Sequence, residues 1–304
     1  MDIDVVVVGG GPAGATCAMF AARLGLATAL VDGMGIGGQL INLHSIKDYP
    51  GFTDVAGWDL SAVLTEQVMN SGVNTMFGEV EGLRNSGGRW VAEVGTEPLA
   101  AKAVVIATGG TPIPVPFGEA YEGRGISYCA TCDGSLYRGK PVAVWGGGDF
   151  AMSEASYLAD LASQVYVLYP QRELVAAMAW QSEAREKQNI EFLPAVELTA
   201  VTGANGVEGI DYVTVPGREG RSLPVAAVFG ASGLVPNSSL VRGLVEMDDA
   251  GFIKTDERLA ASAPGIFAVG DVRTGSPMLI AAAVGDGTRA ALAVAEYIRK
   301  ASKP

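Results

Sequence analysis

Apolar and polar positions at the start of the chain follow the pattern of a strand, a helix and a second strand. Val5–Val8 is an uninterrupted apolar run, typical of a strand buried on both faces, and a strand is predicted over Asp4–Val8. A glycine-rich turn follows, and apolar residues then recur at helical spacing through Ala13–Leu24. Ala27–Val31 is the next apolar run. Together these elements predict a βαβ unit.

The same order of elements recurs in the middle of the chain. A strand is predicted over Val142–Trp145, a glycine turn follows, and a helix is predicted from about Phe150 to Leu161. Val165–Tyr169 completes this second unit, and a further strand is predicted over Ala103–Ala107. Two such units predict an α/β fold with two Rossmann-like, three-layer (ββα) dinucleotide-binding domains, the second inserted into the first.

Two segments are predicted to connect the domains. Thr111–Pro116 contains three prolines, which cannot continue a sheet and favour an extended connector. A second crossing is predicted near Gly233–Asn237. The segment Gly265–Asp271 and a helical tail over about Met278–Ile298 then return to the first domain. The expected domains are residues 1–112 with 240–304, and residues 113–239.

Composition narrows the class of protein. The 304 residues are 49% hydrophobic and 18% charged, as in globular proteins, and the net charge of −12 disfavours a nucleic-acid partner by repulsion. Acidic Asp2 and Asp4, rather than a basic leader, precede the short apolar run at the N-terminus, so we expect no membrane segment and a cytoplasmic location. Three cysteines are too few for a secretory disulfide framework.

Each βαβ unit carries a glycine fingerprint. The two are Gly9-Gly10-Gly11-Pro12-Ala13-Gly14 and Gly146-Gly147-Gly148-Asp149-Phe150-Ala151. The first glycine permits a sharp turn, the second lets the backbone approach a pyrophosphate, and the third position allows close packing of helix on strand. Such turns also occur without a ligand, but two of them in complete βαβ units favour nucleotide binding. Asp32, after the second strand, is placed to accept ribose hydroxyls.

A cysteine pair lies between the fingerprints, in Cys129-Ala130-Thr131-Cys132-Asp133. Such a pair can exchange two electrons by opening and closing a disulfide, with electrons from a flavin or a nicotinamide. Half of a zinc site is the alternative, but structural zinc requires four ligands and the chain offers only Cys17 and His44 besides, so no metal site is predicted. Cys17 lies on the apolar face of its helix and is expected in the core, and no role is assigned to His44.

The order of these motifs resembles the low-molecular-weight thioredoxin reductase family over nearly the whole chain. The matching segments are Gly9–Gly14, Gly37–Leu40, Ala107–Gly109, Cys129–Gly134, Gly146–Ala151 and Gly270–Val272. In that family the first and last segments bind FAD, the middle segment binds NADPH, and the cysteine pair lies in the middle domain. The resemblance therefore implies a flavoprotein disulfide reductase, a homodimer, and a small disulfide protein such as thioredoxin as partner.

The resemblance also implies roles for individual residues. Cys132 faces the flavin, Cys129 exchanges with the external disulfide, and Asp133 donates and accepts the proton that disulfide reduction requires. Asp133 as a simple helix cap is the alternative. The FAD-binding residues are expected to be Gly9, Gly11, Pro12, Ala13, Gly14, Asp32, Gly38, Gln39, Leu40, Thr108, Gly109, Gly270 and Asp271.

The sequence departs from this family in the second nucleotide site. NADPH-using members carry His-Arg-Arg after the second strand and another arginine downstream, which bind the 2′-phosphate. This chain has Tyr169-Pro170-Gln171-Arg172 there and Val175 downstream. Similar departures occur in atypical members that do not use NADPH. The second site is expected to comprise Gly146, Gly148, Asp149, Phe150, Tyr169 and Arg172.

The missing arginines predict that NADPH is not an efficient electron donor. The alternatives are NADH, a second flavin nucleotide, or an unoccupied site with electrons from ferredoxin. The position of Glu173 is late for the acidic residue that an NADH enzyme uses. On the flavin side, Asp48 replaces an asparagine, and Met278-Leu279 replaces an arginine-glutamine pair, which would alter the flavin potential or partner docking.

Three functions follow from these patterns. The first is an FAD-dependent disulfide oxidoreductase that passes two electrons from flavin to Cys129 and Cys132 and on to a protein disulfide, with a donor other than NADPH. The second is an NAD(P)H-dependent thioredoxin reductase with altered nucleotide preference. The third is a flavin-bearing redox sensor whose cysteine pair switches without turnover.

Overall fold

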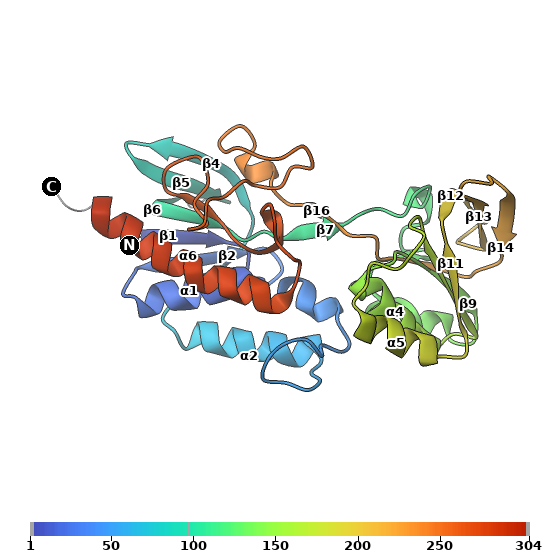
Figure 1. Ribbon diagram of the computed structural model, residues 1–304. Helices are drawn as coiled ribbons and strands as arrows, with labels where there is room; N and C mark the ends of the chain where they lie inside the picture. The colour runs from blue at the N-terminus through green and yellow to red at the C-terminus, as the bar shows by residue number, and fades with distance from the viewer. Residues whose placement is uncertain (1–2, 97, 302–304) are drawn as a thin grey trace. The chain divides into compact units, whose positions relative to one another are not determined.

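In the computed structural model, which describes residues 3–96 and 98–301, the chain divides into two compact units (Figure 1). Unit 1 comprises the chain up to Thr111 and the chain from Val235 onward, and unit 2 runs from Pro112 to Leu234. Each unit contains a mainly or wholly parallel sheet with helices on one face, so the α/β class predicted from the sequence is confirmed.

The sheet of unit 1 is built around β1 and β6. Its strands are β1 (Ile3–Val8), β2 (Thr28–Asp32), β3 (Asn74–Phe77), β4 (Val80–Ser86), β5 (Arg89–Val94), β6 (Leu99–Ile106) and β17 (Ile266–Ala268). The order is β3-β2-β1-β6-β5-β4, and β17 also pairs with β6. β4 and β5 are antiparallel to their neighbours, whereas the other pairs are parallel. β1, near the start of the chain, and β17, near its end, therefore both pair with β6 in one sheet.

Three helices lie along one face of this sheet, namely α1 (Pro12–Arg23), α2 (Gly57–Met69) and α6 (Ile280–Ala301) (Figure 1). α1 and α6 approach closely because a glycine lies at their contact: a Cβ atom on Gly287 would overlap the carbonyl oxygen of Ala13. Cys17 is fully buried in the same layer, which confirms its predicted place in the core. Burial raises the pKa of the Cys17 thiol to about 12, so this cysteine is inert at neutral pH.

Unit 2 repeats the design with three layers. Its parallel sheet has the order β11-β10-β9-β15-β8, formed by β8 (Ile126–Ser127), β9 (Pro141–Trp145), β10 (Gln164–Tyr169), β11 (Ile190–Pro194) and β15 (Val228–Gly230). Helices α4 (Asp149–Ala159) and α5 (Met178–Glu186) share one core with this sheet. A second core lies against the antiparallel sheet of β12 (Val196–Thr202), β13 (Gly209–Thr214) and β14 (Gly220–Leu223).

The chain crosses between the units along two short strands. β7 (Gly110–Pro112) and β16 (Leu234–Pro236) pair with each other. The expectation that the proline-rich segment after Thr111 stays outside any sheet is therefore wrong at its start. The reason is that a two-stranded ribbon consists of edges only, where a proline without an N–H group is tolerated.

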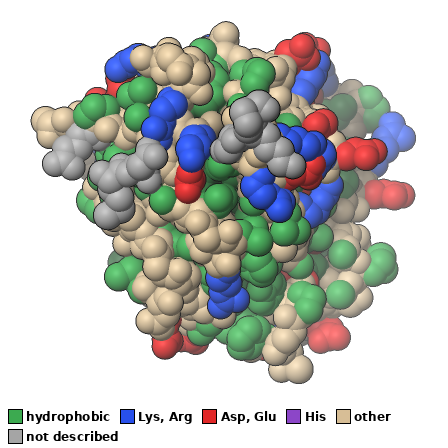
Figure 2. Space-filling model, turned by 90° about the vertical axis from the view of Figure 1, so that its left-hand side faces the viewer, with side chains coloured by type: hydrophobic (Ala, Val, Ile, Leu, Met, Phe, Trp, Pro, Cys, Tyr) green, Lys and Arg blue, Asp and Glu red, His purple; other side chains and the backbone are tan. Residues whose placement is uncertain are grey.

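Short helices complete the fold. They are η1 (Gly38–Asn42), η2 (Glu119–Tyr121), α3 (Ala130–Asp133), η3 (Gly134–Tyr137), η4 (Ser239–Val241) and η5 (Gly270–Val272). No helix within the described residues is long and apolar enough to cross a membrane. On the face shown in Figure 2, basic and acidic side chains are interspersed, with apolar side chains between them.

Candidate active site

The first glycine turn joins β1 to α1, and there are two different reasons for glycine at its positions. A Cβ atom on Gly9 would overlap the carbonyl oxygen of Ala107, and one on Gly14 would overlap the carbonyl oxygen of Gly9. Gly11 is different, because nothing lies within 4 Å of a Cβ atom placed there and its φ of −63° suits any residue. The protein itself therefore does not require glycine at position 11, and the open space fits a ligand that approaches the backbone.

The start of α1 suits an anionic ligand. Gly11 is the N-cap and offers no side chain, Pro12 opens the helix, and no acidic residue lies in the first turn. Ala13 is buried there, and η5 packs against it, since a Cβ atom on Gly270 would come within 2.9 Å of the Ala13 Cβ atom. Free N–H groups and the helix dipole at such an end attract phosphate groups.

Asp32 closes the same turn from the end of β2. Its Oδ2 accepts the backbone N–H of Gly10 at 2.6 Å, and its Oδ1 accepts those of Met34 and Gly35 at 2.7 Å each. A carboxylate has about four acceptor positions, so room remains for another donor. The ribose contact stays a prediction, whereas the bonds show that Asp32 also fixes the backbone of the turn.

The segment η1 lies against the turn. A Cβ atom on Gly38 would come within 3.0 Å of the Gly11 Cα atom, and Gly38 has a φ of 53°, which favours glycine. Gln39 donates its side-chain amide to the carbonyl oxygen of Gly110 at 3.2 Å. Leu40 is buried. Three predicted FAD residues are thus held beside the glycine turn.

Thr108 and Gly109 are held by Asn237. The Thr108 hydroxyl donates to the Asn237 carbonyl oxygen at 2.6 Å, and the Asn237 side-chain amide donates to the Thr108 carbonyl oxygen at 3.0 Å. The Asn237 N–H donates to the Gly109 carbonyl oxygen at 2.9 Å. The backbone nitrogen of Thr108 lies 3.0 Å from a Cβ atom placed on Gly9, so this loop borders the turn. Sequence reasoning missed Asn237 as the residue that fixes the loop.

Buried polar contacts also fix η5. The N–H of Gly270 donates to Oδ2 of Asp286 at 3.1 Å, and Arg273 binds both oxygens of Asp286, at 2.5 and 2.9 Å. Asp271 accepts the Ser276 hydroxyl at 2.9 Å, and burial raises the pKa of Asp271. Unit 1 therefore brings the predicted FAD residues of five separate segments to one edge of its sheet. The open space at Gly11 and the uncapped start of α1 fit the pyrophosphate of FAD.

The second glycine turn, between β9 and α4, repeats the first. A Cβ atom on Gly146 would overlap the carbonyl oxygen of Ala231, whereas nothing lies within 4 Å of one on Gly148. The φ of Gly148 is −95°, which again suits any residue. This turn therefore has the same open space for a ligand as the turn at Gly11.

The surroundings of the second turn are different. Tyr169 takes the place of Asp32, because a Cβ atom on Gly147 would come within 3.2 Å of the Tyr169 Cβ atom. Asp149 places a carboxyl group in the first turn of α4 and accepts the N–H of Ala177 at 2.6 Å. Phe150 is partly buried against the core of unit 2. An acidic residue at the start of the helix is unfavourable for a phosphate.

Cations around this second turn are few. Arg172 is exposed, and Arg185 of α5 lies 5.1 Å from the centre of the Phe192 ring. Burial raises the pKa of Tyr169, and Arg185 opposes this shift, so this arginine is electrostatically close to Tyr169. Val175 and Ala176 instead donate their N–H groups to the Gly147 carbonyl oxygen, at 3.0 and 3.1 Å. The segment that carries a downstream arginine in NADPH-using relatives thus contributes backbone contacts.

The cysteine pair begins α3. Cys129 and Cys132 form a disulfide with their Cα atoms 5.3 Å apart. Cys129 is the N-cap of α3, and its sulfur accepts the N–H of Cys132 at 3.1 Å. Cys129 is only 9% exposed, whereas Cys132 is exposed. An N–H group aimed at a sulfur stabilises its thiolate after reduction.

Asp133 lies one residue beyond the pair. Its Oδ2 accepts the hydroxyl of buried Ser127 at 2.7 Å, and the Ser127 oxygen also accepts the N–H of Cys129 at 3.2 Å. The side chain of Asp133 makes no capping bond to η3, so its interpretation as a simple helix cap is wrong. The proton-transfer role of Asp133 stays a prediction. Ser127, which the sequence did not reveal as a site residue, connects Asp133 to the backbone of Cys129 through its hydroxyl group.

Sequence reasoning also missed Glu154 of α4. Its side chain is 1% exposed, and its Oε2 accepts the N–H of Ala130, between the two cysteines, at 2.6 Å. The signal was present in the sequence, because Glu154 shares helical spacing with buried Ala151 and Leu158. A charged residue type on an apolar helix face marks a site that packing alone does not explain.

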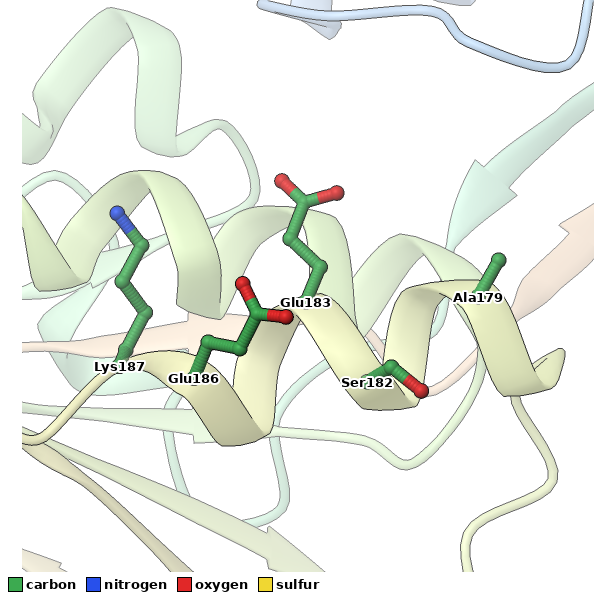
Figure 3. A pocket seen from close by; sticks show the side chains of 5 residues that line it. All are labelled: Ala179, Ser182, Glu183, Glu186 and Lys187. Carbon is green, nitrogen blue, oxygen red and sulfur yellow. The ribbon is translucent and has the colours of Figure 1, made fainter.

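Other features lie apart from these sites. Within the described residues no group of three His, Cys, Asp or Glu side chains could hold a metal ion. A shallow hollow on α5 is lined by Ala179, Ser182, Glu183, Glu186 and Lys187 (Figure 3). It contains neither glycine turn nor the cysteine pair.

Comparisons with known proteins agree with this geometry. A profile of the family described as pyridine nucleotide-disulphide oxidoreductase matches residues 3–287. The chain is 34% identical over 301 residues to thioredoxin reductase of Bacillus subtilis, with 98% of this chain and 95% of that protein covered. It is 32% identical over 299 residues to a 34.2 kDa protein in the rubredoxin operon of Clostridium pasteurianum, with 97% of each covered. The crystal structure of Lactococcus lactis thioredoxin reductase superposes with a TM-score of 0.96 at 33% identity, covering 98% of this chain and all of that one.

Proposed function

The chain belongs to the pyridine nucleotide-disulphide oxidoreductase family and is a flavin-dependent disulfide oxidoreductase of the thioredoxin reductase type, and from this premise we propose its electron path. Two electrons pass from FAD to the Cys129–Cys132 disulfide and on to a protein disulfide such as that of thioredoxin, and the electron donor is not NADPH. The observation that carries the proposal is the disulfide at the start of α3, in the unit whose glycine turn lacks the arginine cluster.

Unit 1 supplies the residues that would hold FAD. Gly11, Ala13 and Gly14 surround the start of α1 for the pyrophosphate, and Gln39 and Asp271 line the adjoining segments. Bound FAD supplies two electrons to the disulfide. The protein's share is to fix these segments before the cofactor binds, which the hydrogen bonds of Asp32 and Asn237 accomplish.

The cysteine pair then carries the electrons outward. Two electrons and one proton break the Sγ–Sγ bond and leave one thiolate and one thiol. The Cys129 thiolate attacks the substrate disulfide and forms a mixed disulfide, and Cys132 attacks Cys129 to release the substrate. Asp133 moves the Cys132 proton to the departing substrate thiolate, and a second proton from solvent completes the substrate dithiol.

The second glycine turn supports a donor other than NADPH. Each charged hydrogen bond to a 2′-phosphate is worth about 1.5–3 kcal/mol, and the positions that would supply them are Pro170, Gln171 and Val175. Ferredoxin, a carrier of single electrons, is the donor that we favour.

A resident nucleotide at the second turn is the other candidate. The open space at Gly148 favours it, because the protein itself does not require glycine there. NADH and a second flavin nucleotide both lack a 2′-phosphate, so both fit the absence of the arginines.

Release and counting of bound nucleotides tests the cofactor assignment. The protein is purified, denatured and analysed by chromatography, and we expect one FAD per chain; a second nucleotide per chain would identify the ligand of the Gly148 turn. A protein without flavin after expression in flavin-supplemented cells would contradict the proposal.

Thioredoxin reduction tests the cysteine assignment. With chemically reduced flavin as electron source, Cys129→Ser is expected to abolish reduction of the substrate disulfide. Cys17→Ala is the matched control, because that cysteine is buried in unit 1 and is expected to leave the activity unchanged. Equal activity of the Cys129→Ser variant and the wild type would refute the proposed path.

A further inference from the structure

Glu154 is the buried acidic side chain of unit 2 that contacts the cysteine turn. It lies on α4, and its Oε2 accepts the N–H of Ala130 at 2.6 Å. Ala130 follows Cys129 directly and is the first residue of α3. The carboxyl group therefore holds the backbone of the turn that carries both sulfurs, and it does so from a position with 1% exposure.

The second carboxyl oxygen of Glu154 has no hydrogen-bond partner within the described residues, and it is buried. Ala130, whose N–H Glu154 accepts, and Ala151, Met152, Ala155 and Leu158 of its own helix belong to one fully buried apolar core. A buried carboxylate with one backbone donor and no cation is strongly unfavourable, and a buried acid in such a place keeps its proton.

The pKa of Glu154 is shifted in the direction that this geometry predicts. Burial raises the pKa of Glu154 to about 8, although the bond from Ala130 lowers it. The ionisable groups on the elements that pack against α4 are Asp133 on α3; Glu183, Arg185 and Glu186 on α5; Tyr166 and Tyr169 on β10; and Glu191 on β11. Asp149 and Tyr157 lie on α4 itself. None of these described groups contributes to the shift of Glu154.

We propose that Glu154 is a positioning residue of the cysteine pair that also holds a proton beside it, so that reduction of the disulfide is coupled to the protonation of this buried acid. The inference rests on the proposed function only for the source of electrons. Two electrons and one proton break the Sγ–Sγ bond and leave one thiol and one thiolate, and Cys129 is the residue directly before Ala130, whose N–H is bonded to Glu154. A negative sulfur disfavours a negative carboxylate nearby, so the reduced protein binds the Glu154 proton more tightly than the oxidised protein does.

The sign of the pH effect follows from this difference. Below pH 8 the acid is largely protonated in both redox states and adds no proton to the reaction. Above pH 8 the oxidised protein loses this proton while the reduced protein retains it, so reduction takes up one extra proton. The equilibrium constant for reduction then falls by a further tenfold per pH unit, which is about 29.6 mV for this two-electron couple.

The test is the midpoint potential of the pair as a function of pH. Wild type and Glu154→Gln are equilibrated in dithiothreitol redox buffers from pH 6 to 9.5, quenched by alkylation and analysed by mass spectrometry. Glutamine can still accept the Ala130 N–H but does not titrate. Below pH 8 we expect the midpoint potentials of wild type and variant to change with pH at the same rate. Above pH 8 we expect the equilibrium constant for reduction of the wild type to fall by up to a further tenfold per pH unit relative to that of the variant.

Ser156→Ala is the matched control, since Ser156 is also buried on α4 and does not ionise. This variant is expected to keep the wild-type slope. Parallel slopes of wild type and Glu154→Gln over the whole range, with or without a constant offset between them, would overturn the proposal. Because dithiothreitol replaces the flavin and the protein substrate, failure here is distinguishable from failure of the proposed function.

Discussion

The two glycine turns of this protein have the same backbone geometry and different surroundings. Gly11 and Gly148 both lie in ordinary conformations with open space where a side chain would be, whereas Gly9 and Gly146 are required by overlap with a neighbouring strand. The shared part is what any dinucleotide needs, namely a close approach to the backbone at a helix start. The backbone alone therefore does not distinguish one nucleotide from another.

The difference lies in the charged groups. In unit 1 the carboxylate of Asp32, at the end of β2, fixes the backbone of the turn. The first turn of α1 contains no acidic residue. In unit 2 the aromatic Tyr169 takes that place, and acidic Asp149 lies in the first turn of α4. The same fold thus provides one turn whose surroundings suit the pyrophosphate of FAD and one beside which Pro170, Gln171 and Val175 carry no positive charge.

The largest expected effect comes from filling the open space in each turn. Gly11→Leu should lower FAD affinity by at least about tenfold, the equivalent of 1.4 kcal/mol, because the side chain occupies the ligand's place. Gly148→Leu should leave the FAD content unchanged. Flavin per folded chain, measured by absorbance, checks both. Equal FAD loss in the two variants would contradict the claim that FAD binds at the Gly11 turn and not at the Gly148 turn.

Arginines at the positions that lack them should allow the second turn to bind NADPH more tightly. The triple variant Pro170→Arg, Gln171→Arg, Val175→Arg is expected to bind NADPH about 10- to 100-fold more tightly than the wild type, if one well-formed charged bond at about 1.5–3 kcal/mol results. Isothermal titration with NADPH measures the gain, and titration with NADH is the control, since its affinity should change little. An equal gain for both nucleotides would show that the arginines do not act on the 2′-phosphate.

The acidic residues beside the turns should differ in importance. Asp32→Ala removes the acceptor of three backbone N–H groups and is expected to destabilise unit 1 by about 1.5–3 kcal/mol. Asp149→Ala removes one such bond, that of Ala177, and should cost less. Urea unfolding of the flavin-free variants measures both. A larger loss for Asp149→Ala would contradict the fixing role of Asp32.

A further effect concerns pH and stability. The pKa of Glu154 rises from 4.5 to about 8 on folding, so its contribution is most favourable below pH 4.5 and is lost as the pH rises toward 8. Relative to Glu154→Gln, the wild type should lose up to about 1.4 kcal/mol per pH unit in that window. Urea unfolding at pH 6 and pH 7.5 measures the difference. A wild type that gains stability relative to the variant over this interval would show the opposite sign.

Much of the fold and part of the site follow from local sequence patterns. The apolar runs and glycine spacing predict β1, α1, β9 and α4, because strand burial and glycine conformation depend on neighbouring residues. The burial of Cys17 follows from helical spacing in the same way.

The remaining contacts depend on distant residues. Asn237 fixes Thr108 across 129 positions of sequence, and Glu154 meets Ala130 only because α3 and α4 pack together. The strand β7 was not predicted, because Pro112 argues against a strand and only pairing with the distant β16 makes this segment part of a sheet. Such contacts require the tertiary fold and leave little trace in a single sequence.

Anaerobic reduction of the bound flavin is the most direct test of the central claim, that NADPH does not serve this enzyme. The oxidised holoenzyme is mixed in a stopped-flow instrument with stoichiometric NADPH and, separately, with reduced ferredoxin, and the flavin absorbance is followed. We expect ferredoxin to bleach the flavin and NADPH to leave it oxidised over the time of a catalytic turnover. Rapid bleaching by NADPH would contradict the account.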